Sequence, residues 1–405
     1  MKIYILSSFE DSMKRDTGAS VRIYNLAKGL CMLGNDVHLI IPKEETANGC
    51  VDGVIVHSVR GFWPNVVLKV LAKIVGVARS TSLYFFDFMF LVKISRLIRQ
   101  SDVVQIEQQT VGGLLVPFIR KVLGRPVVID CHDVFQALRL KNTGVLRRAL
   151  ETFTEKTAYN YADLILTVSQ KEKRCLKYYG IRERRVEVIP NGVDIECFTD
   201  LPEISKVREK YDLEKSRIVI FVGNMEYSPN REAVELLSSM IAPKVLENIQ
   251  NVKFLVVGRK PRETKLPNIV FTGVVDSVPK LLAISDVAVA PLLHGSGTRL
   301  KILEYLSCGL PVISTSIGVE GLEVTNGFNI LIEDNMERFA SKIVQLLKDQ
   351  TLCNNLAEAA RELATTKYDW KIASKKLDSS LRRRFQNAIL SLPQNLADAD
   401  YLSDL

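Results

Sequence analysis

The segment HGSGTRLKILE combines glycine, basic and acidic residues at spacings that suit a phosphate-containing ligand. Gly295 and Gly297 lack side chains, so their backbone can approach a ligand closely. Arg299 and Lys301 place positive charge where a helix is expected to begin, and the free N–H groups of a helix start also favour an anion. Glu304 can share a helix face with Lys301 and accept hydrogen bonds from ribose hydroxyls. This pattern predicts a nucleoside diphosphate at a helix N-terminus; the alternative is a plain loop and a solvated helix face.

The elements around this segment alternate between strand and helix, which indicates a parallel sheet. Short apolar runs predict strands at 217–222, 254–258, 269–273, 287–291 and 311–315, and a helix is expected from 229 to about 248. Ligands of such sheets bind beyond the carboxyl ends of the strands. The other candidate ligand-binding residues therefore lie in the loops after these strands: Gly223, Asn224, Gly273, Val274, Ser296 and Thr298.

The first half of the chain opens with a strand, a helix and a second strand, at 2–8, about 19–33 and 36–41. This is the order of half a Rossmann fold, but it lacks the G-x-G-x-x-G of a dinucleotide site. Gly18 precedes the helix, and His132 follows a strand at 126–130, so both are expected at the ligand edge of this sheet. The alternatives are a helix start without a ligand and a structural histidine.

Residues 62–100 differ from their surroundings because aromatic and basic residues are interleaved there with a single acid, Asp87. Apolar residues from Val66 to Val75 recur at helical spacing, with lysines elsewhere. A basic amphipathic helix with aromatic residues suits an anionic membrane surface. Packing of the apolar face against a sheet explains the same pattern, so peripheral membrane contact and core packing are both left open.

Composition narrows the class of protein. The chain has 405 residues, of which 47% are hydrophobic and 25% charged, as in soluble globular proteins of two or three domains. A net charge of +8 with no nucleic-acid-binding motif does not indicate a DNA or RNA partner. The seven scattered cysteines indicate free thiols in a reducing compartment, and we find no signal peptide or transmembrane run. A cytoplasmic location is expected, with peripheral contact at the inner face of the membrane if 62–100 binds lipid.

Taken in order, these motifs resemble the retaining nucleotide-sugar glycosyltransferases of family 4, over nearly the whole chain. The matching motifs are TGASVR at 17–22, CHD at 131–133, VIPNGVD at 188–194, FVG at 221–223, YSPN at 227–230, and GSGTRLK at 295–301 with Glu304. The resemblance implies a GT-B fold, in which two Rossmann-like, doubly wound domains face each other across a cleft. The implied boundaries are 1–196 for an acceptor domain, 197–369 for a donor domain, 370–390 for a helix that returns to the first domain, and 391–405 for a disordered tail.

The resemblance also implies a role for each motif residue. Glu304 would bind the ribose, Arg299 and Lys301 would neutralise the diphosphate, and Gly18 would let a loop of the first domain close on the phosphates. His132 would lie beside the transferred sugar, so His132, Arg299, Lys301 and Glu304 are the expected catalytic residues. The donor would be a UDP- or GDP-sugar, and the acceptor a glycan or a lipid-linked molecule.

Two departures from the family pattern affect these roles. Ser296 stands where the family has the first glutamate of a pair, and the loop after Gly223 lacks the usual arginine and lysine for phosphate. We therefore assign the phosphate role to Arg299 and Lys301. Because we see no carboxylate cluster in the sequence, we expect neither a metal nor another cofactor. The alternatives are a nucleotide-sugar-binding protein without turnover and a sugar-nucleotide epimerase of the same fold.

Overall fold

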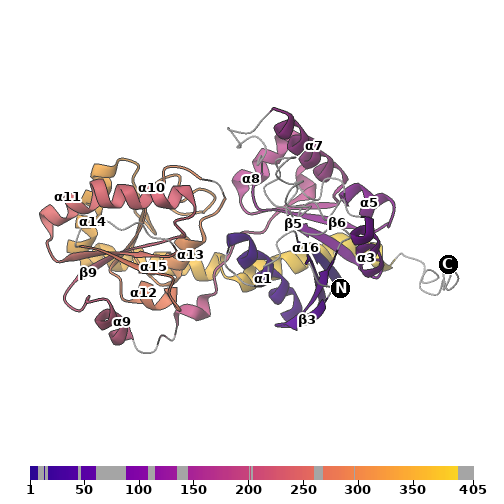
Figure 1. Cartoon of the computed structure of the whole chain (residues 1–405). Coiled ribbons are helices and arrows are strands. Elements are labelled where there is room, and N and C mark those ends of the chain that lie inside the picture. The colour runs from indigo at the N-terminus through magenta and orange to yellow at the C-terminus, as the bar shows by residue number, and fades with distance from the viewer. Residues whose placement is uncertain are drawn as a thin grey trace. The chain divides into compact units, whose positions relative to one another are not determined.

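The computed structural model describes residues 1–7, 13, 17–43, 47–60, 88–107, 115–134, 145–199, 201, 204–259, 268–295 and 297–390. The chain divides into two compact α/β units, which are shown in Figure 1. The first unit comprises Met1–Thr167, Glu172–Ile189 and Ser374–Leu405, and the second comprises Val168–Lys171 and Pro190–Ala373.

The first unit is built on an eight-stranded sheet of order β3-β4-β2-β1-β5-β6-β7-β8. The strands are β1 (Lys2–Leu6), β2 (Asp36–Pro42), β3 (Ala47–Val51), β4 (Val54–Val59), β5 (Val103–Glu107), β6 (Val127–Cys131), β7 (Leu164–Thr167) and β8 (Val186–Val188). All neighbouring pairs are parallel except β3 and β4. The sequence analysis missed β3, although Asp52 and Gly53 (φ 49° and 84°) form the Asp-Gly turn typical of a tight hairpin.

Helices of the first unit are α1 (Gly18–Met32), α3 (Phe88–Ile98), α5 (Leu115–Lys121), α7 (Val145–Tyr161), α8 (Gln170–Cys175) and α16 (Trp370–Leu390), with 3₁₀ turns at Leu176–Tyr179 and Glu183–Arg185. Two of these helices are divided between the units: α8 belongs to the first unit from Glu172 onward, and α16 from Ser374 onward. Helix α16 packs closely on α1, because a Cβ on Gly29 would overlap the side chain of Ser374. Glycine is therefore required where these two helices meet.

Helix α3 is the described end of the stretch at 62–100, for which the sequence left both membrane contact and core packing open. Phe90, Ile94 and Ile98 recur along one face of the helix and lie fully buried in the core that covers β5 and β6. Met89 remains exposed. Core packing therefore explains the apolar face of this helix, while residues 61–87 lie outside the described residues. Among the described residues, no helix is both long and apolar enough to span a membrane.

The second unit has a six-stranded parallel sheet of order β11-β10-β9-β12-β13-β14. The strands are β9 (Arg217–Val222), β10 (Val252–Val257), β11 (Ile269–Gly273), β12 (Val287–Ala290), β13 (Val312–Ser314) and β14 (Leu331–Ile332). Side chains of β9 alternate between two cores: Val219 and Phe221 belong to one, Ile218 and Ile220 to the other. The continuous apolar run of this strand is thus that of a sheet covered on both faces.

The helices of the second unit lie on both faces of the sheet, as Figure 1 shows. They are α9 (Ile204–Lys210), α10 (Ser228–Leu236), α11 (Ala242–Asn248), α12 (Val278–Ala283), α13 (Leu300–Ser307), α14 (Met336–Lys348) and α15 (Gln350–Lys367), with a 3₁₀ turn at Ile195–Phe198. The helix predicted from 229 to 248 is present, but a π-helical turn at Leu237–Ile241 divides it into α10 and α11. Hydrophobic periodicity predicts the helix but not this local change in its winding.

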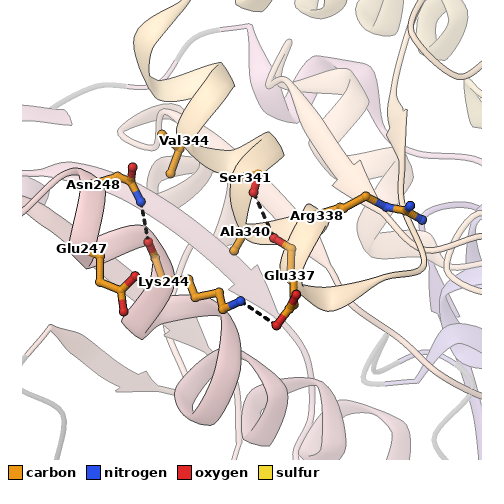
Figure 2. A pocket seen from close by; sticks show the side chains of 8 residues that line it. All are labelled: Lys244, Glu247, Asn248, Glu337, Arg338, Ala340, Ser341 and Val344. Carbon is orange, nitrogen blue, oxygen red and sulfur yellow. Dashed lines mark hydrogen bonds and ion pairs between the residues drawn. The ribbon is translucent and has the colours of Figure 1, made fainter.

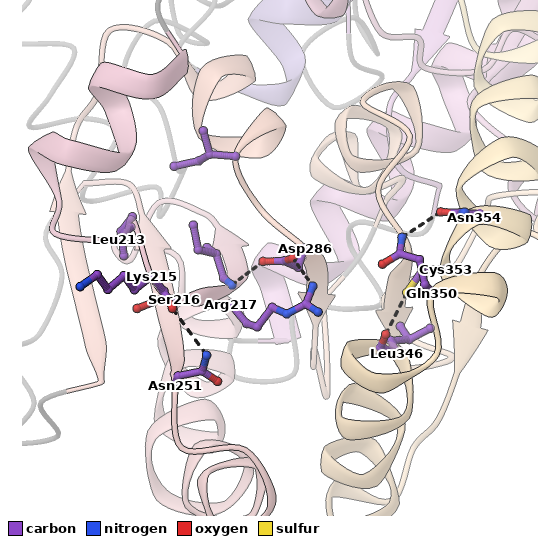
Figure 3. Close-up of polar contacts among 12 residues, drawn as sticks. Leu213, Lys215, Ser216, Arg217, Asn251, Asp286, Leu346, Gln350, Cys353 and Asn354 are labelled. Atoms are coloured by element: carbon purple, nitrogen blue, oxygen red, sulfur yellow. Dashed lines mark hydrogen bonds and ion pairs between the residues drawn. The ribbon is translucent and has the colours of Figure 1, made fainter.

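The sheet of the second unit is held in register at the amino end of β9 (Figure 3). The Asp286 carboxylate accepts a hydrogen bond from the backbone N–H of Ile218 at 2.7 Å and another from Arg217 at 3.0 Å. Asp286 directly precedes β12, so one side chain ties the starts of the two central strands together. This places the loops that leave the carboxyl ends of β9 and β12 side by side.

Candidate functional site

The candidate donor site lies where the strand order of the second sheet reverses. Strands β9 and β12 are neighbours, although β10 and β11 come between them in the chain. Gly223 follows β9, and Gly295 follows the end of β12. Ligands of open α/β sheets bind beyond the carboxyl ends of the strands at such a reversal. The topology therefore brings two of the predicted glycine loops to one place.

Lys301 extends from the first turn of α13 to the loop that follows β9. Its Nζ donates a hydrogen bond to Asn230 Oδ1 at 2.7 Å and lies 4.2 Å from the ring centroid of Phe221. A Cβ placed on Gly223 would come within 2.8 Å of the same nitrogen. The loop that lacks a cation of its own thus receives one from a helix much later in the chain.

Burial changes the acid–base properties of Lys301 and Glu304. Both side chains keep some solvent contact but are surrounded by protein atoms. Desolvation, and then the charge of Arg299, lower the pKa of Lys301 to about 7, against the opposing effect of Glu304. Desolvation raises the pKa of Glu304 to about 7, against the opposing charge of Lys301. An anionic ligand would favour the charged form of Lys301, so the site is prepared for negative charge.

The Gly295 loop is shaped by two positive φ angles, 125° at Gly295 and 75° at Gly297. A Cβ on Gly295 would lie 2.7 Å from Arg299 Nη2 and 3.0 Å from Tyr227 Oη. Arg299 is 8% exposed, and its Nη1 donates to the Gly297 carbonyl at 2.7 Å. Thr298 Oγ1 is buried and has no hydrogen-bond partner among the described residues. The guanidinium therefore lies folded against its own loop, at the N-cap of α13.

The remaining predicted donor residues occupy different positions. Asn224 accepts the N–H of Glu226 on its side chain at 3.0 Å, which closes its own loop. Gly273 (φ 69°) ends β11, and the next residue, Val274, is 72% exposed. Strand β11 is separated from β9 by β10, so this pair lies about 10 Å from the Gly223 loop at the usual strand spacing. Ser296 lies outside the described residues.

In the first unit, His132 and Gly18 flank a buried polar network at the carboxyl edge of the sheet. His132 Nε2 lies 2.8 Å from Glu107 Oε2, and Gln105 Nε2 donates to the other Glu107 oxygen at 2.7 Å. Arg22 makes two hydrogen bonds to Asp130, at 2.8 and 2.9 Å. Burial, and then the Asp130 charge, raise the pKa of Glu107, against opposing effects of His132 and Gln105.

Gly18 is the first residue of α1, and the side chain of Thr17 caps this helix. The hydroxyl of Thr17 accepts from the N–H of Ser20 at 3.2 Å, while the hydroxyl of Ser20 accepts from the N–H of Thr17 at 2.9 Å. The helix starts beside the carboxyl end of β1, as expected from the strand–helix–strand order. Gly18 itself is exposed, so its backbone can be approached.

The sequence analysis expected no carboxylate cluster, and the structure corrects this. Glu107 and Asp130 are both buried, and with His132 they form the one group of three potential metal ligands found among the described residues. The two carboxylates stand at the ends of neighbouring strands, β5 and β6, which sequence spacing alone does not reveal. Because Asp130 is already bound by both nitrogens of a guanidinium, the group is better described as an ion-paired network than as a metal site.

Asn230 and Glu107 are the site residues that the sequence analysis missed. Asn230 was noted only as part of the YSPN motif, and Glu107 was not singled out. For Asn230 the available signal was a polar residue at the start of a helix, and for Glu107 it was a polar residue at the end of a buried strand. Neither pattern distinguishes a site residue from an ordinary cap.

A cavity of about 310 Å³ in the second unit lies between α11 and α14 (Figure 2). It is lined mostly by polar side chains, including an ion pair between Lys244 and Glu337 at 2.7 Å. None of the predicted site residues lines it. We therefore place the candidate site at the glycine loops and not in this cavity.

Two family models match the chain. The model described as Glycosyltransferase Family 4 matches residues 17–197, and the model described as Glycosyl transferases group 1 matches residues 216–349. Together the two matches take in well over half of the sequence. The chain belongs to glycosyltransferase family 4. This finding confirms the family 4 membership predicted from the motifs and makes the chain a glycosyltransferase.

Curated relatives of this family 4 chain have low but extended identity. A UDP-Gal:alpha-D-GlcNAc-diphosphoundecaprenol alpha-1,3-galactosyltransferase of Escherichia coli is 26% identical over 66% of this chain and 72% of its own length. A chitobiosyldiphosphodolichol beta-mannosyltransferase of Candida albicans is 25% identical over 67% of this chain and 66% of its own length. A phosphatidyl-myo-inositol mannosyltransferase of Mycolicibacterium smegmatis is 26% identical over 46% of this chain and 49% of its own length.

Solved structures share the fold of this family 4 chain. Sucrose-phosphate synthase of Thermosynechococcus elongatus superposes with a TM-score of 0.73 at 17% identity, covering 96% of this chain and 100% of its own. HepE of Anabaena, in complex with UDP and glucose, has a TM-score of 0.71 at 18% identity, covering 95% of this chain and 100% of its own. Two parallel-sheet α/β units and these neighbours confirm the GT-B fold predicted from the sequence.

Proposed function

We propose that this glycosyltransferase transfers a hexose from a UDP- or GDP-sugar to a glycan or lipid-linked acceptor, with retention of anomeric configuration. One observation carries the donor assignment: the ammonium of Lys301 lies under Gly223, at the sheet reversal where ligands of α/β sheets bind. Support for the acceptor comes from relatives whose names specify diphosphate-linked lipids or phosphatidyl-inositol.

In this proposal, charge that develops on the leaving diphosphate is stabilised by cations fixed in advance. Arg299 occupies the N-cap position of α13, and Lys301 lies in the first turn of this helix. Groups held in place need no reorganisation when the negative charge forms, which makes such stabilisation effective. The chain's own cations would thus take the role that a metal has in other transferases, and we propose that no metal or other cofactor is needed.

The other predicted residues have proposed roles around the same donor. Glu304 would accept hydrogen bonds from the ribose hydroxyls, a role for which its ionised form is better suited because both oxygens then act only as acceptors. Gly223, Asn224, Gly295, Ser296, Gly297 and Thr298 would line the diphosphate. Gly273 and Val274 would border the nucleoside, which would lie farther along the strand edge. In the first unit, His132 would contact the transferred sugar and Gly18 the phosphates.

The proposal is tested first by thermal shift with UDP, GDP and ADP and their sugar conjugates, with and without EDTA. A ligand that binds only the folded state raises the melting temperature. We expect a shift with one nucleotide that EDTA does not change. Absence of a shift with all of them would reject the diphosphate site.

Transfer itself is then measured with the selected donor and polyprenyl-diphosphate-linked or phosphatidyl-inositol acceptors. We expect a product whose anomeric configuration, read by NMR coupling constants, equals that of the donor, and no product with folded Glu304→Ala. An inverted product would reject retention. Conversion of the donor without any acceptor would indicate an epimerase, and binding without turnover a binding protein; family membership favours neither alternative.

We further propose that the enzyme works in the cytoplasm at the inner face of the membrane, because its relatives act on lipid-linked acceptors. Co-sedimentation with anionic vesicles at low salt tests this, since electrostatic attraction to lipid is strongest there. Failure to sediment under these conditions would reject membrane contact.

A further inference from the structure

We propose that Asn230 is a positioning residue of the donor site, which holds the Lys301 ammonium under the Gly223 loop without cancelling its charge. This inference rests on the proposed donor site and assigns to it Asn230, a residue of the YSPN motif for which no role was predicted. Asn230 lies in the first turn of α10, while Lys301 belongs to α13, 71 residues later.

The contacts of Asn230 fix both ends of its carboxamide. Nδ2 donates to the carbonyl of Asn224 at 2.8 Å, and Oδ1 accepts from Lys301 Nζ at 2.7 Å. The reverse orientation would place an NH₂ against an ammonium and an oxygen against a carbonyl, so chemistry determines which atom faces which partner. The side chain is 7% exposed and cannot turn away into solvent. One amide thus ties the lysine to the loop that follows β9.

The surroundings of Lys301 show why such a holder is needed. Among the described residues, Asn230 Oδ1 is the one hydrogen-bond acceptor of Nζ; the Phe221 ring supplies only a cation–π contact. The charged groups that act on Lys301 are Arg299, which disfavours its protonation, and Glu304, which favours it but forms no ion pair with it in the described structure. Without the amide, the ammonium would lose its fixed position and part of its stabilisation.

The arrangement also requires a neutral side chain at position 230. A carboxylate at position 230 would hold Lys301 equally well but would neutralise it, leaving less attraction for a diphosphate. A neutral oxygen orients the ammonium and leaves its full charge available to a ligand. Gly223 completes the arrangement, because a Cβ there would lie 2.8 Å from Asn230 Cγ and from Lys301 Nζ. Backbone, amide and ammonium therefore form one packed unit at the loop.

The first test follows the titration of Lys301 in the ligand-free full-length protein by ¹⁵N-lysine NMR, with the signal assigned by its absence in Lys301→Met. Wild-type Lys301 should titrate with a pKa of about 7. In Asn230→Ala its pKa should fall, because a hydrogen bond to the charged form is lost; in Asn230→Asp it should rise, because a counter-charge is gained. Asn248→Ala, at an exposed asparagine of α11, should leave it unchanged.

The second test measures UDP and GDP affinity calorimetrically between pH 6 and 9. At pH 8, Asn230→Ala should bind the preferred nucleotide about tenfold more weakly than wild type and regain most of the affinity at pH 6, since hydrogen bonds to charged groups are among the stronger ones. A merely structural asparagine would weaken binding equally at both pH values. Asn230→Asp should bind more weakly at every pH above 6.

Identical Lys301 titration in wild type and Asn230→Ala would overturn the inference. If Asn230→Ala does not fold, Asn230→Asp decides by the same titration, and an unchanged pKa overturns it. If wild type binds neither nucleotide, the proposed function fails, whereas the ligand-free titration still decides whether Asn230 holds Lys301. The two failures are therefore distinguishable.

Discussion

The carboxyl edges of the two sheets both hold charged residues but arrange them in opposite ways. In the first unit, Arg22 and Asp130 are each about 1% exposed and form an ion pair, and Glu107 accepts a hydrogen bond from Gln105 and lies 2.8 Å from His132 Nε2. In the second unit, Lys301 and Glu304 keep solvent contact, and a neutral amide holds the lysine. At the edge of the first sheet, the buried charges are paired within the protein. At the edge of the second sheet, the positive charge of Lys301 remains available to attract an anionic ligand.

The difference teaches how to separate structural from functional charge. A buried ion pair with complete hydrogen bonding already has its partner, so removal of one member leaves an uncompensated charge. A cation held by a neutral group beside glycine backbone gains a charged partner only from outside. The following predictions test that contrast, and they begin with the largest expected effect.

Asp130→Ala should destabilise the first unit by about 3–5 kcal/mol, because Arg22 would remain buried without its counter-ion. The measurement is urea-induced unfolding followed by circular dichroism. As a control, Lys177→Ala removes an ion pair with Glu183 whose partners are both more than half exposed, and should cause no measurable change. If both substitutions changed the free energy of unfolding equally, Asp130 would not be the counter-ion on which the buried Arg22 depends.

Lys301→Met should lower the transfer rate by about 10²–10³-fold, the usual loss on removal of a group that stabilises developing charge. The melting temperature should stay constant or rise, because burial already disfavours the ammonium and methionine fills similar space. Stability would thus respond in the direction opposite to that of Asp130→Ala. The matched control is Lys244→Met, at an exposed ion pair with Glu337, which should keep full activity. If Lys301→Met lowered the melting temperature and left the transfer rate unchanged, Lys301 would be a structural residue, and the contrast between the two sheet edges would be wrong.

Nucleotide binding should take up protons at pH 8. The pKa of Lys301 is lowered to about 7 in the free protein, and a bound diphosphate would raise it, so a site mostly neutral at pH 8 becomes charged on binding. Titration calorimetry in Tris and in phosphate, whose ionisation enthalpies differ, measures this uptake. It should vanish in Lys301→Met, and an unchanged uptake in that variant would assign the proton to another group.

The smallest expected effect concerns a histidine pair on β2 and β4 of the first unit. His38 Nδ1 lies 2.9 Å from His57 Nε2, and Asn48 contacts the other His57 nitrogen at 2.9 Å. Burial, then His38 and Lys2, lower the pKa of His57 below its usual 6.5. The unfolded chain therefore binds a proton more readily, so stability should decline as the pH falls below about 6.5.

His57→Asn should remove part of that decline, which comparison of urea unfolding at pH 5.5 and 7.5 measures. His294→Asn provides the control, because His294 is exposed and paired with Glu232. A pH dependence identical to wild type would mean that the pair carries its proton equally in both states.

The sequence predicted most elements of the second sheet to within a residue or two, because an apolar run of a strand covered on both faces is a local signal. It missed β3, a short edge strand with exposed residues and no apolar run, whose one signal was an Asp-Gly turn. It also missed the π-helical turn between α10 and α11, which depends on packing rather than on propensity. Hydrophobic periodicity identifies buried residues, whereas the edge strand β3 and the π-helical turn do not depend on a pattern of buried residues.

By itself the sequence determined the fold class, the glycine loops and the basic start of α13, because backbone freedom, charge and hydrophobic spacing are properties of neighbouring residues. The tertiary structure alone decided which distant side chains meet. Lys301 reaches Asn230 and Gly223, not a partner on its own helix, and Glu107 joins Asp130 through two adjacent strands. The order of the strands in each sheet determines these contacts. That order follows from how whole helices and sheets pack together, and no local pattern of residues specifies it.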